Sequence, residues 1–172
     1  RALISAVSLL AAAAAATALG PKDGGGRNVA ILIFPGVQII DYTGPWEVLG
    51  HAYVNGKPAF HMYTVSDSTD PITTSMGMSV NPTFRFGREP KPDLIVVPGG
   101  NVDPQLENGA VIAWLRENAK SAELVLSVCN GAFFLAKAGL LDGLEATTFA
   151  GLIDELKVAA PKTRVVSDKR FV

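Results

Sequence analysis

The sequence contains one cysteine among its 172 residues, so it can form no internal disulfide. It also lacks an excess of positive charge, because 15 Lys and Arg stand against 16 Asp and Glu, a formal net charge of −1. Surfaces that bind nucleic acid normally show a basic excess, so we expect no nucleic-acid partner. A domain of about 150 residues hides roughly 70% of the surface of its unfolded chain. One hydrophobic core can therefore hold the fold without a disulfide or a structural metal.

Metal-ligand and phosphate-binding motifs are absent as well. His51 and His61 are the only histidines, and neither belongs to a cluster of His, Cys, Asp and Glu at ligand spacing. The glycine triplet Gly24–Gly26 precedes the first predicted strand, whereas a phosphate-binding loop follows one. We therefore expect no metal and no cofactor, and a small-molecule substrate as the partner.

The first residues have the pattern of an export signal. A basic residue is followed by an Ala/Leu run and by Ala16-Thr17-Ala18, the small-x-small pattern of a signal-peptidase site. The alternative is a membrane anchor, but the run falls short of the roughly 20 strongly apolar residues of a spanning helix. We expect a signal peptide over 1–18, a flexible linker over 19–27, one domain over 28–172, and an exported product, periplasmic or secreted, with no membrane contact after cleavage.

Alternating strands and helices are predicted along the rest of the chain. Apolar runs bounded by Gly and Pro indicate buried parallel strands, and a stripe of period 3.6 indicates helices. Residues 72–86 are expected to form short extended pieces, and residues 145–148 an extended segment. Strands are expected at Val29–Phe34, Phe60–Ser66, Leu94–Val97, Glu123–Val128 and from Arg164 onward. Helices are expected from Gly44 to Tyr53 and at 111–119, 131–138 and 152–159. Pro45 is expected in the first position of the first helix.

This order predicts a doubly wound α/β fold: a mostly parallel sheet with helices on both faces. In such sheets ligands bind outside the carboxyl ends of the strands. Asp41 follows the first strand, Gly99 and Gly100 follow the third, and Cys129 follows the fourth. These residues are expected to meet at one edge of the sheet.

Cys129 lies between a predicted strand and a predicted helix, in the segment Ser127–Ala132. Such a turn presents a nucleophile to the cleft, like the nucleophile elbow of hydrolases with sulfur in place of oxygen. The amides of the following helix are expected to lower the pKa of the thiol. The alternative is that Cys129 is a small buried apolar residue, the usual role of a lone cysteine.

The neighbouring residues have two interpretations each. Gly99 and Gly100, supported by Asn130, could bring backbone N–H groups to a reacting oxyanion, or they could simply end a strand. Asp41 could exchange a proton beside the thiol, or it could cap a helix through local amides.

Several motifs in the same order resemble the ThiJ/PfpI superfamily, which has a class I glutamine-amidotransferase-like, flavodoxin-like fold. The resemblance covers residues 28–172, and its Asp-x-Thr-Gly-Pro form is similar to that of isonitrile hydratases and of the sensor domains of AraC-type regulators. The motifs are Val29–Gly36, Asp41–Val48, Val97–Gly100, Cys129–Ala132, Ala138–Gly143 and Ala146–Thr148.

The resemblance implies a homodimer and assigns catalytic roles. In the hydratases a cysteine and this aspartate add water to an isocyanide, so by resemblance Cys129 attacks carbon and Asp41 shuttles the proton. Two positions depart from the relatives: Phe149 stands where many carry His, and Asn130 stands where the hydratases carry Thr. The family's last strand and helix are expected to be missing.

Three functions remain open at this point. The first is an exported cysteine-dependent hydratase or hydrolase that depends on Cys129 and Asp41. The second is a sensor domain that binds a small molecule without converting it, as in AraC-type transcription regulators. The third is a redox or stress-protective role, in which Cys129 is oxidised to a sulfinic acid.

Overall fold

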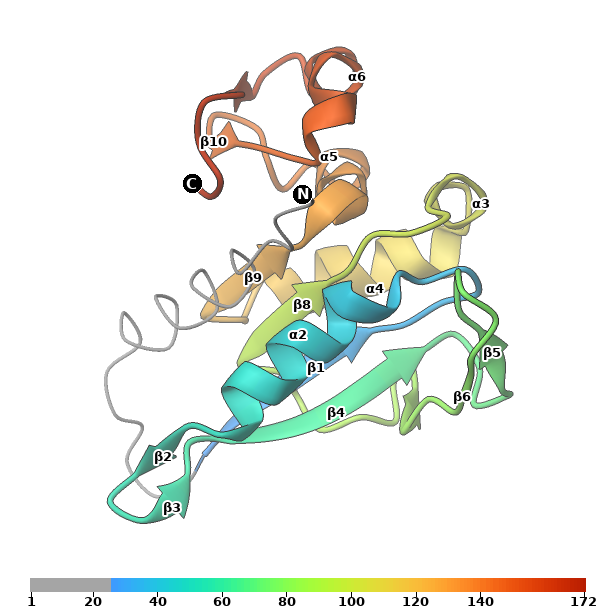
Figure 1. The fold of residues 1–172 in the computed structure, drawn as a ribbon, viewed down its shortest axis with the longest axis vertical. Coiled ribbons are helices and arrows are strands. Elements are labelled where there is room, and N and C mark those ends of the chain that lie inside the picture. The colour runs from blue at the N-terminus through green and yellow to red at the C-terminus, as the bar shows by residue number, and fades with distance from the viewer. Residues whose placement is uncertain (1–25) are drawn as a thin grey trace, which may run out of the picture.

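A computed structural model describes residues 26–172 of the chain. The predicted signal peptide and most of the predicted linker lie outside the described residues. At the centre is a five-stranded sheet in which every pairing is parallel (Figure 1). Its strands, in spatial order, are β7 (Phe84–Arg85), β4 (Phe60–Ser66), β1 (Arg27–Leu32), β8 (Leu94–Val97) and β9 (Leu124–Ser127).

The central strand β1 explains why the sheet is buried on both faces. Residues Val29 to Ile33 have no exposed surface, and Phe34 is 1% exposed. A continuous apolar run of this kind suits a strand covered by helices on both sides. The strand begins at Arg27, a residue that the sequence analysis placed in the linker, because Arg27 already pairs with Phe60 of β4.

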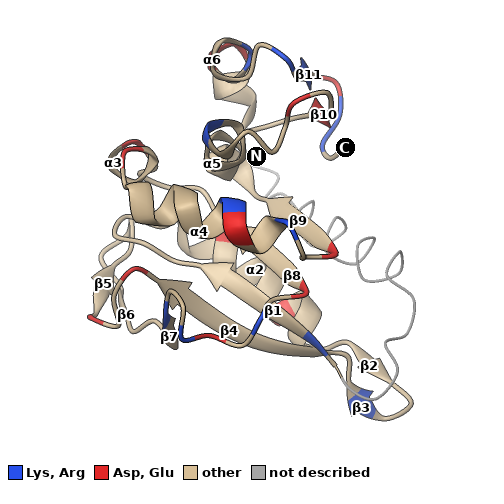
Figure 2. Cartoon of the chain, turned by 180° about the vertical axis from the view of Figure 1, so that it is seen from behind, with Lys and Arg blue, Asp and Glu red and all other residues tan. Residues whose placement is uncertain are grey.

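The order of the strands creates a switch point between β1 and β8. From β1 the chain continues to β4 on one side, and β8 and β9 are then added on the other side. The chain continues from β1 and from β8 into helices on opposite faces of the sheet (Figures 1 and 2). In open α/β sheets ligands bind at the carboxyl ends of the strands at such a point. The predicted doubly wound α/β fold is confirmed.

The helices cover both faces of the sheet. Helix α2 (Ile39–Gly50) lies over one face and α4 (Gly109–Ala119) over the other, as the two opposite views show (Figures 1 and 2). A short helix, α3 (Asp103–Leu106), precedes α4, and α5 (Ala132–Ala138) packs beside α4. No helix within residues 26–172 is long and apolar enough to cross a membrane.

Helix α2 begins five residues earlier than the sequence analysis predicted. Pro45 is not its first residue but lies inside it, and the helix ends at Gly50. Because proline has no backbone N–H, Pro45 donates no hydrogen bond to the Asp41 carbonyl four residues earlier. The helix nevertheless continues through Pro45, because Pro45 and Gly44 are buried against the rest of the fold. Asp41 therefore lies in the first turn of α2 rather than in a loop before it.

Three small two-stranded sheets complete the fold. β2 (Tyr53–Val54) and β3 (Lys57–Pro58) form a hairpin, so Tyr53 is an exposed strand residue rather than part of the preceding helix. β5 (Ile72–Thr73) and β6 (Ser79–Val80) form the second hairpin. The third sheet pairs β10 (Glu145–Ala146) with β11 (Arg164–Val165) in parallel, apart from the central sheet. It lies with α6 (Ile153–Ala159) beyond α5 (Figure 1).

Candidate active site

Cys129 occupies a strained turn between β9 and α5. It opens a short 3₁₀ turn (Cys129–Gly131) and has φ of +55°. Among the described residues only one other non-glycine residue, Asn55, has positive φ, and asparagine adopts this conformation far more readily than cysteine. A non-glycine residue held there costs about 1–3 kcal/mol and is typical of functional sites. The predicted sharp strand-to-helix turn at Cys129 is therefore present in the structure.

The turn is held against the end of strand β8. The Val128 N–H donates to the Val97 carbonyl at 3.0 Å, and the Thr148 hydroxyl donates to the Cys129 carbonyl at 3.0 Å. Gly131 permits this close approach, because a Cβ atom there would lie 2.1 Å from the Val97 oxygen. The turn therefore requires glycine at position 131.

Asp41 lies beside the thiol, from the first turn of α2. It is 6% exposed, and its Oδ2 accepts the Gly99 N–H at 3.1 Å. The carboxylate also accepts a hydrogen bond from the Cys129 thiol. Burial raises the pKa of Asp41, and the hydrogen bonds from Gly99 and Cys129 oppose that rise. The predicted meeting of Asp41 and Cys129 at one edge of the sheet is present in the structure.

The pKa of Cys129 is shifted in the opposite direction to that expected from the sequence. Burial and the negative charge of Asp41 raise it, and only the Asn130 N–H acts to lower it. Burial, together with the Asp41 charge, therefore outweighs the amide that favours the thiolate. These effects disfavour the thiolate of Cys129 relative to a free cysteine.

The amides of Gly99 and Gly100 have partners within the protein. The Gly99 N–H donates to Asp41, and the Gly100 N–H donates to Asn130 Oδ1 at 2.8 Å. Both amides thus support side chains of the site, and their use toward a reacting oxyanion, one of the two interpretations of the sequence, stays a prediction. The backbone amide directed at the Cys129 sulfur is that of Asn130.

Asn130 was predicted to support Gly99 and Gly100, and the structure shows how its side chain contacts Gly100. Its Nδ2 donates to the Gly100 carbonyl at 2.9 Å while its Oδ1 accepts the Gly100 N–H. An amide side chain can pair with both groups of one peptide residue, and a position next to the nucleophile was the only available signal. Thr148, part of the family motif, was not expected to hold the Cys129 carbonyl.

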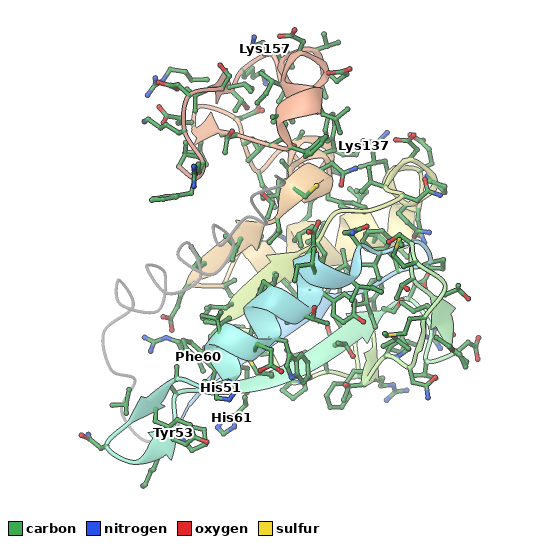
Figure 3. All side chains as sticks on the ribbon, viewed as in Figure 1. His51, Tyr53, Phe60, His61, Lys137 and Lys157 are labelled. Carbon is green, nitrogen blue, oxygen red and sulfur yellow. The ribbon has the colours of Figure 1, made fainter. Side chains whose placement is uncertain are left out.

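The histidines lie far from this site. His51 follows the end of α2 and His61 belongs to β4, and both lie at the end of the molecule that carries the β2–β3 hairpin (Figure 3). Lys137 of α5, the helix after the cysteine turn, lies at the opposite end of the view. Phe149, at the position where relatives carry His, is 56% exposed. Within the described residues Cys129 therefore has a carboxylate partner and no imidazole partner.

The remaining charged groups do not build another site. Within residues 26–172 no group of three or more His, Cys, Asp and Glu could hold a metal ion. Lysines, arginines and acids are distributed over many elements rather than gathered by sign on the face in view (Figure 2). The candidate site is the pair of Asp41 and Cys129 at the switch point of the sheet.

A cysteine on a strained strand-to-helix turn of a doubly wound sheet, paired with a carboxylate, defines a class of amidotransferase-like α/β proteins. Residues 27–172 match the DJ-1/PfpI family, so the chain belongs to that family.

Individual relatives point to two functions. An isonitrile hydratase from Pseudomonas putida is 38% identical over 145 residues, which is 82% of this chain and 61% of that protein. The HTH-type transcriptional regulator CdhR from Pseudomonas aeruginosa is 28% identical over 137 residues, 80% of this chain and 41% of the regulator. The crystal structure of a ThiJ/PfpI family protein from Pseudomonas syringae superposes with a TM-score of 0.72 at 29% identity, covering 79% of this chain and 55% of that chain. The chain thus spans less than two thirds of the length of these relatives.

Proposed function

We propose that the protein is an isocyanide hydratase that uses Cys129 as nucleophile and Asp41 as proton shuttle. The observation that carries the proposal is the hydrogen bond from the Cys129 thiol to the buried Asp41 carboxylate, on a strained turn at the switch point of the sheet. The 38% identity to an isonitrile hydratase supports the choice of substrate.

The chemistry of isocyanides suits a thiol that still carries its proton. The terminal carbon of an isocyanide gains a bond to the nucleophile and a bond to hydrogen. In the first step the Cys129 sulfur bonds to this carbon, and the thiol proton passes through the Asp41 carboxylate to the same carbon, which gives a thioimidate. The raised pKa of Cys129 is therefore compatible with reaction, because thiol and carboxylate together supply the nucleophile and the proton.

Water completes the cycle. It adds to the thioimidate carbon, and Asp41 accepts and returns the proton as the carbon–sulfur bond breaks. The product is an N-substituted formamide, and the Cys129 thiol is regenerated. The net reaction is the addition of one water molecule to the isocyanide, without oxidation or reduction.

The test is whether the purified protein converts alkyl and aryl isocyanides to formamides, with the products measured by chromatography. Cys129→Ala is expected to reduce turnover to the uncatalysed rate, and Asp41→Asn to reduce kcat by about 10²–10⁴. Asp103→Asn is the matched control, because Asp103 is an exposed acid in the first turn of α3. Full turnover by Cys129→Ala, or no formamide from any isocyanide with the unmodified protein, would contradict the proposal.

A sensor function is the second candidate, favoured by the regulator that aligns with 80% of this chain. It predicts that isocyanides or other small electrophiles raise the melting temperature without being consumed. The redox alternative is less well supported, because oxidation proceeds through the thiolate and the pKa of Cys129 is raised.

We also propose that the protein is exported and forms a homodimer. Export is supported by the Ala16-Thr17-Ala18 pattern. Amino-terminal sequencing of the protein from the periplasm or medium is expected to begin after Ala18. Sedimentation equilibrium is expected to give twice the monomer mass, and a monomer at micromolar concentration would contradict the dimer.

A further inference from the structure

The Asn130 side chain joins two loops that meet at the active site. Its Oδ1 accepts the Gly100 N–H at 2.8 Å, and its Nδ2 donates to the Gly100 carbonyl at 2.9 Å. Both hydrogen bonds go to one residue, so the pairing fixes the orientation of Gly100 as well as its distance. The cysteine turn after β9 is thereby attached to the loop after β8.

Gly99 passes through a narrow gap between Asn130 and Asp41. A Cβ atom at position 99 would lie 2.1 Å from Asn130 Oδ1 and 2.9 Å from Asp41 Oδ2. On the other side the Gly99 carbonyl accepts the Gln38 N–H at 2.9 Å. Asn130 and Asp41 therefore hold adjacent peptide groups of the same short loop.

Gly100 has little freedom to place this loop differently. Its φ is +133°, and a Cβ atom there would lie 2.3 Å from the Gly36 oxygen. Movement of Gly100 away from Asn130 would also turn the preceding peptide, whose N–H donates to Asp41. The two amide hydrogen bonds are thus coupled to the hydrogen bond on the carboxylate.

We propose that Asn130 is a positioning residue, whose side-chain amide locks Gly100 to the cysteine turn and thereby aims the Gly99 N–H at Asp41. This inference rests on the proposed function in that Asp41 and Cys129 are taken as the reacting pair. Asn130 does not touch the reacting atoms through its side chain. It acts by fixing the Gly99 N–H, a donor that orients the Asp41 carboxylate and opposes the rise in its pKa caused by burial.

The test follows the Gly99 amide and the Asp41 carboxyl by NMR while pH is varied. In the unmodified protein the Gly99 amide proton is expected to shift with the ionisation of Asp41, assigned by comparison with Asp41→Asn. In Asn130→Ala the Gly99 amide is expected to respond less, and the Asp41 midpoint to move to higher pH, because the carboxylate loses a donor. The kcat is expected to fall by about 10², as for a small misplacement of catalytic groups, with KM little changed.

Asn101→Ala is the matched control. Asn101 follows Gly100 in the same loop, is exposed, and its side chain makes no hydrogen bond with the described residues. This variant is expected to keep the Asp41 midpoint, the response of Gly99 and the kcat of the unmodified protein.

A second variant covers the case in which Asn130→Ala does not fold. Asn130→Asp keeps an acceptor for the Gly100 N–H and removes the donor to the Gly100 carbonyl, so the Gly99 response is expected to be intermediate. Because the added negative charge by itself raises the Asp41 midpoint, only the Gly99 response is interpreted in this variant. An unchanged Gly99 response in the folded variants, together with an unchanged Asp41 midpoint where Asn130→Ala folds, would overturn the inference. If these signals move as expected but no isocyanide is hydrated by the unmodified protein, the proposed reaction fails and the positioning role stands.

Discussion

At the scale of single residues, the site is decided by the contact between Asp41 and Cys129. An isolated cysteine before a helix would have a lowered pKa, because the helix amides favour the thiolate. Here burial and the Asp41 charge raise the pKa of Cys129 instead. The hydrogen bond between the two groups also raises the pKa of Cys129 and lowers that of Asp41. The ionisation of Cys129 is therefore coupled to that of Asp41.

The pH dependence of Cys129 alkylation should show this coupling. We expect the midpoint to lie above that of a free thiol, about 8.5, because burial and Asp41 raise the pKa. Asp41→Asn should lower the midpoint, because the negative charge is removed while the burial remains. Iodoacetamide labelling across pH, followed by mass spectrometry, measures both values. Asp103→Asn is the control, and a midpoint that Asp41→Asn leaves in place would mean that the two groups do not interact.

Gly131 allows a stringent test of the turn. Gly131→Ala would place Cβ 2.1 Å from the Val97 oxygen, so we expect a loss of about 1–3 kcal/mol in the free energy of unfolding, as for overpacking. Gly109→Ala is the matched control, because Gly109 begins α4 and a Cβ there meets nothing within 4 Å. It should change stability by at most about 1 kcal/mol, toward greater stability. Urea unfolding measures both, and equal effects would contradict the packing argument.

At the scale of elements, the start of α2 determines where the carboxylate lies. The first turn contains Asp41, and the Thr43 hydroxyl donates to the Ile39 carbonyl at 2.8 Å. Pro45 suggested a helix that begins at that residue, since proline is favoured in the first helical position. The helix instead begins at Ile39, with Gly44 and Pro45 buried in its interior. Asp41 therefore lies in its first turn, where it accepts the Gly99 N–H.

Helix α4 provides a prediction that separates stability from activity. Asn108 is its N-cap, and its Oδ1 accepts the Ala110 N–H at 3.0 Å. Asn108→Ala should lower the free energy of unfolding by about 1 kcal/mol, as for loss of a helix cap. The kcat for isocyanides should stay unchanged, because α4 contributes no residue to the thiol–carboxylate pair. Thermal unfolding and turnover are measured on the same sample, and a loss of kcat in the folded variant would contradict this assignment.

At the scale of the whole molecule, the fold buries a carboxyl group that would be more stable in water. The pKa of Asp41 is raised by burial above its value in the unfolded chain, about 3.9. The folded state therefore binds this proton more tightly, and the stability that protonation confers is lost as pH rises through the folded-state pKa. Holding the carboxylate in its charged form at this buried position therefore costs stability, as is common in active sites.

Asp41→Asn should accordingly be more stable than the unmodified protein at pH 7. The difference should shrink as pH falls through the folded-state pKa of Asp41, and vanish near the unfolded value of about 3.9. Denaturant unfolding at a series of pH values measures it. Asp103→Asn, at an exposed position, should show no such dependence. A variant Asp41→Asn that is less stable at pH 7 would show that the carboxylate contributes net stabilisation.

Much of the architecture followed from local patterns in the sequence. The strands at Phe60–Ser66 and Leu94–Val97 were predicted with their observed bounds, because apolar runs between Gly and Pro are strong signals. Extended segments near 145 and 164 were also predicted, but they pair only with each other. Which strands join one sheet depends on contacts between distant residues, and local periodicity does not contain that information.

The sequence by itself determined the doubly wound fold, the strand-to-helix setting of Cys129 and the edge at which Asp41, Gly99 and Gly100 meet. The tertiary structure decided the direction in which the Cys129 pKa is shifted, the partners of the Gly99 and Gly100 amides, and the two hydrogen bonds between the Asn130 side chain and Gly100. The physical reason is the range of the interactions. Periodicity and turn chemistry act over a few residues, whereas burial and charge at this site depend on segments that are 30 and 58 residues apart in the chain.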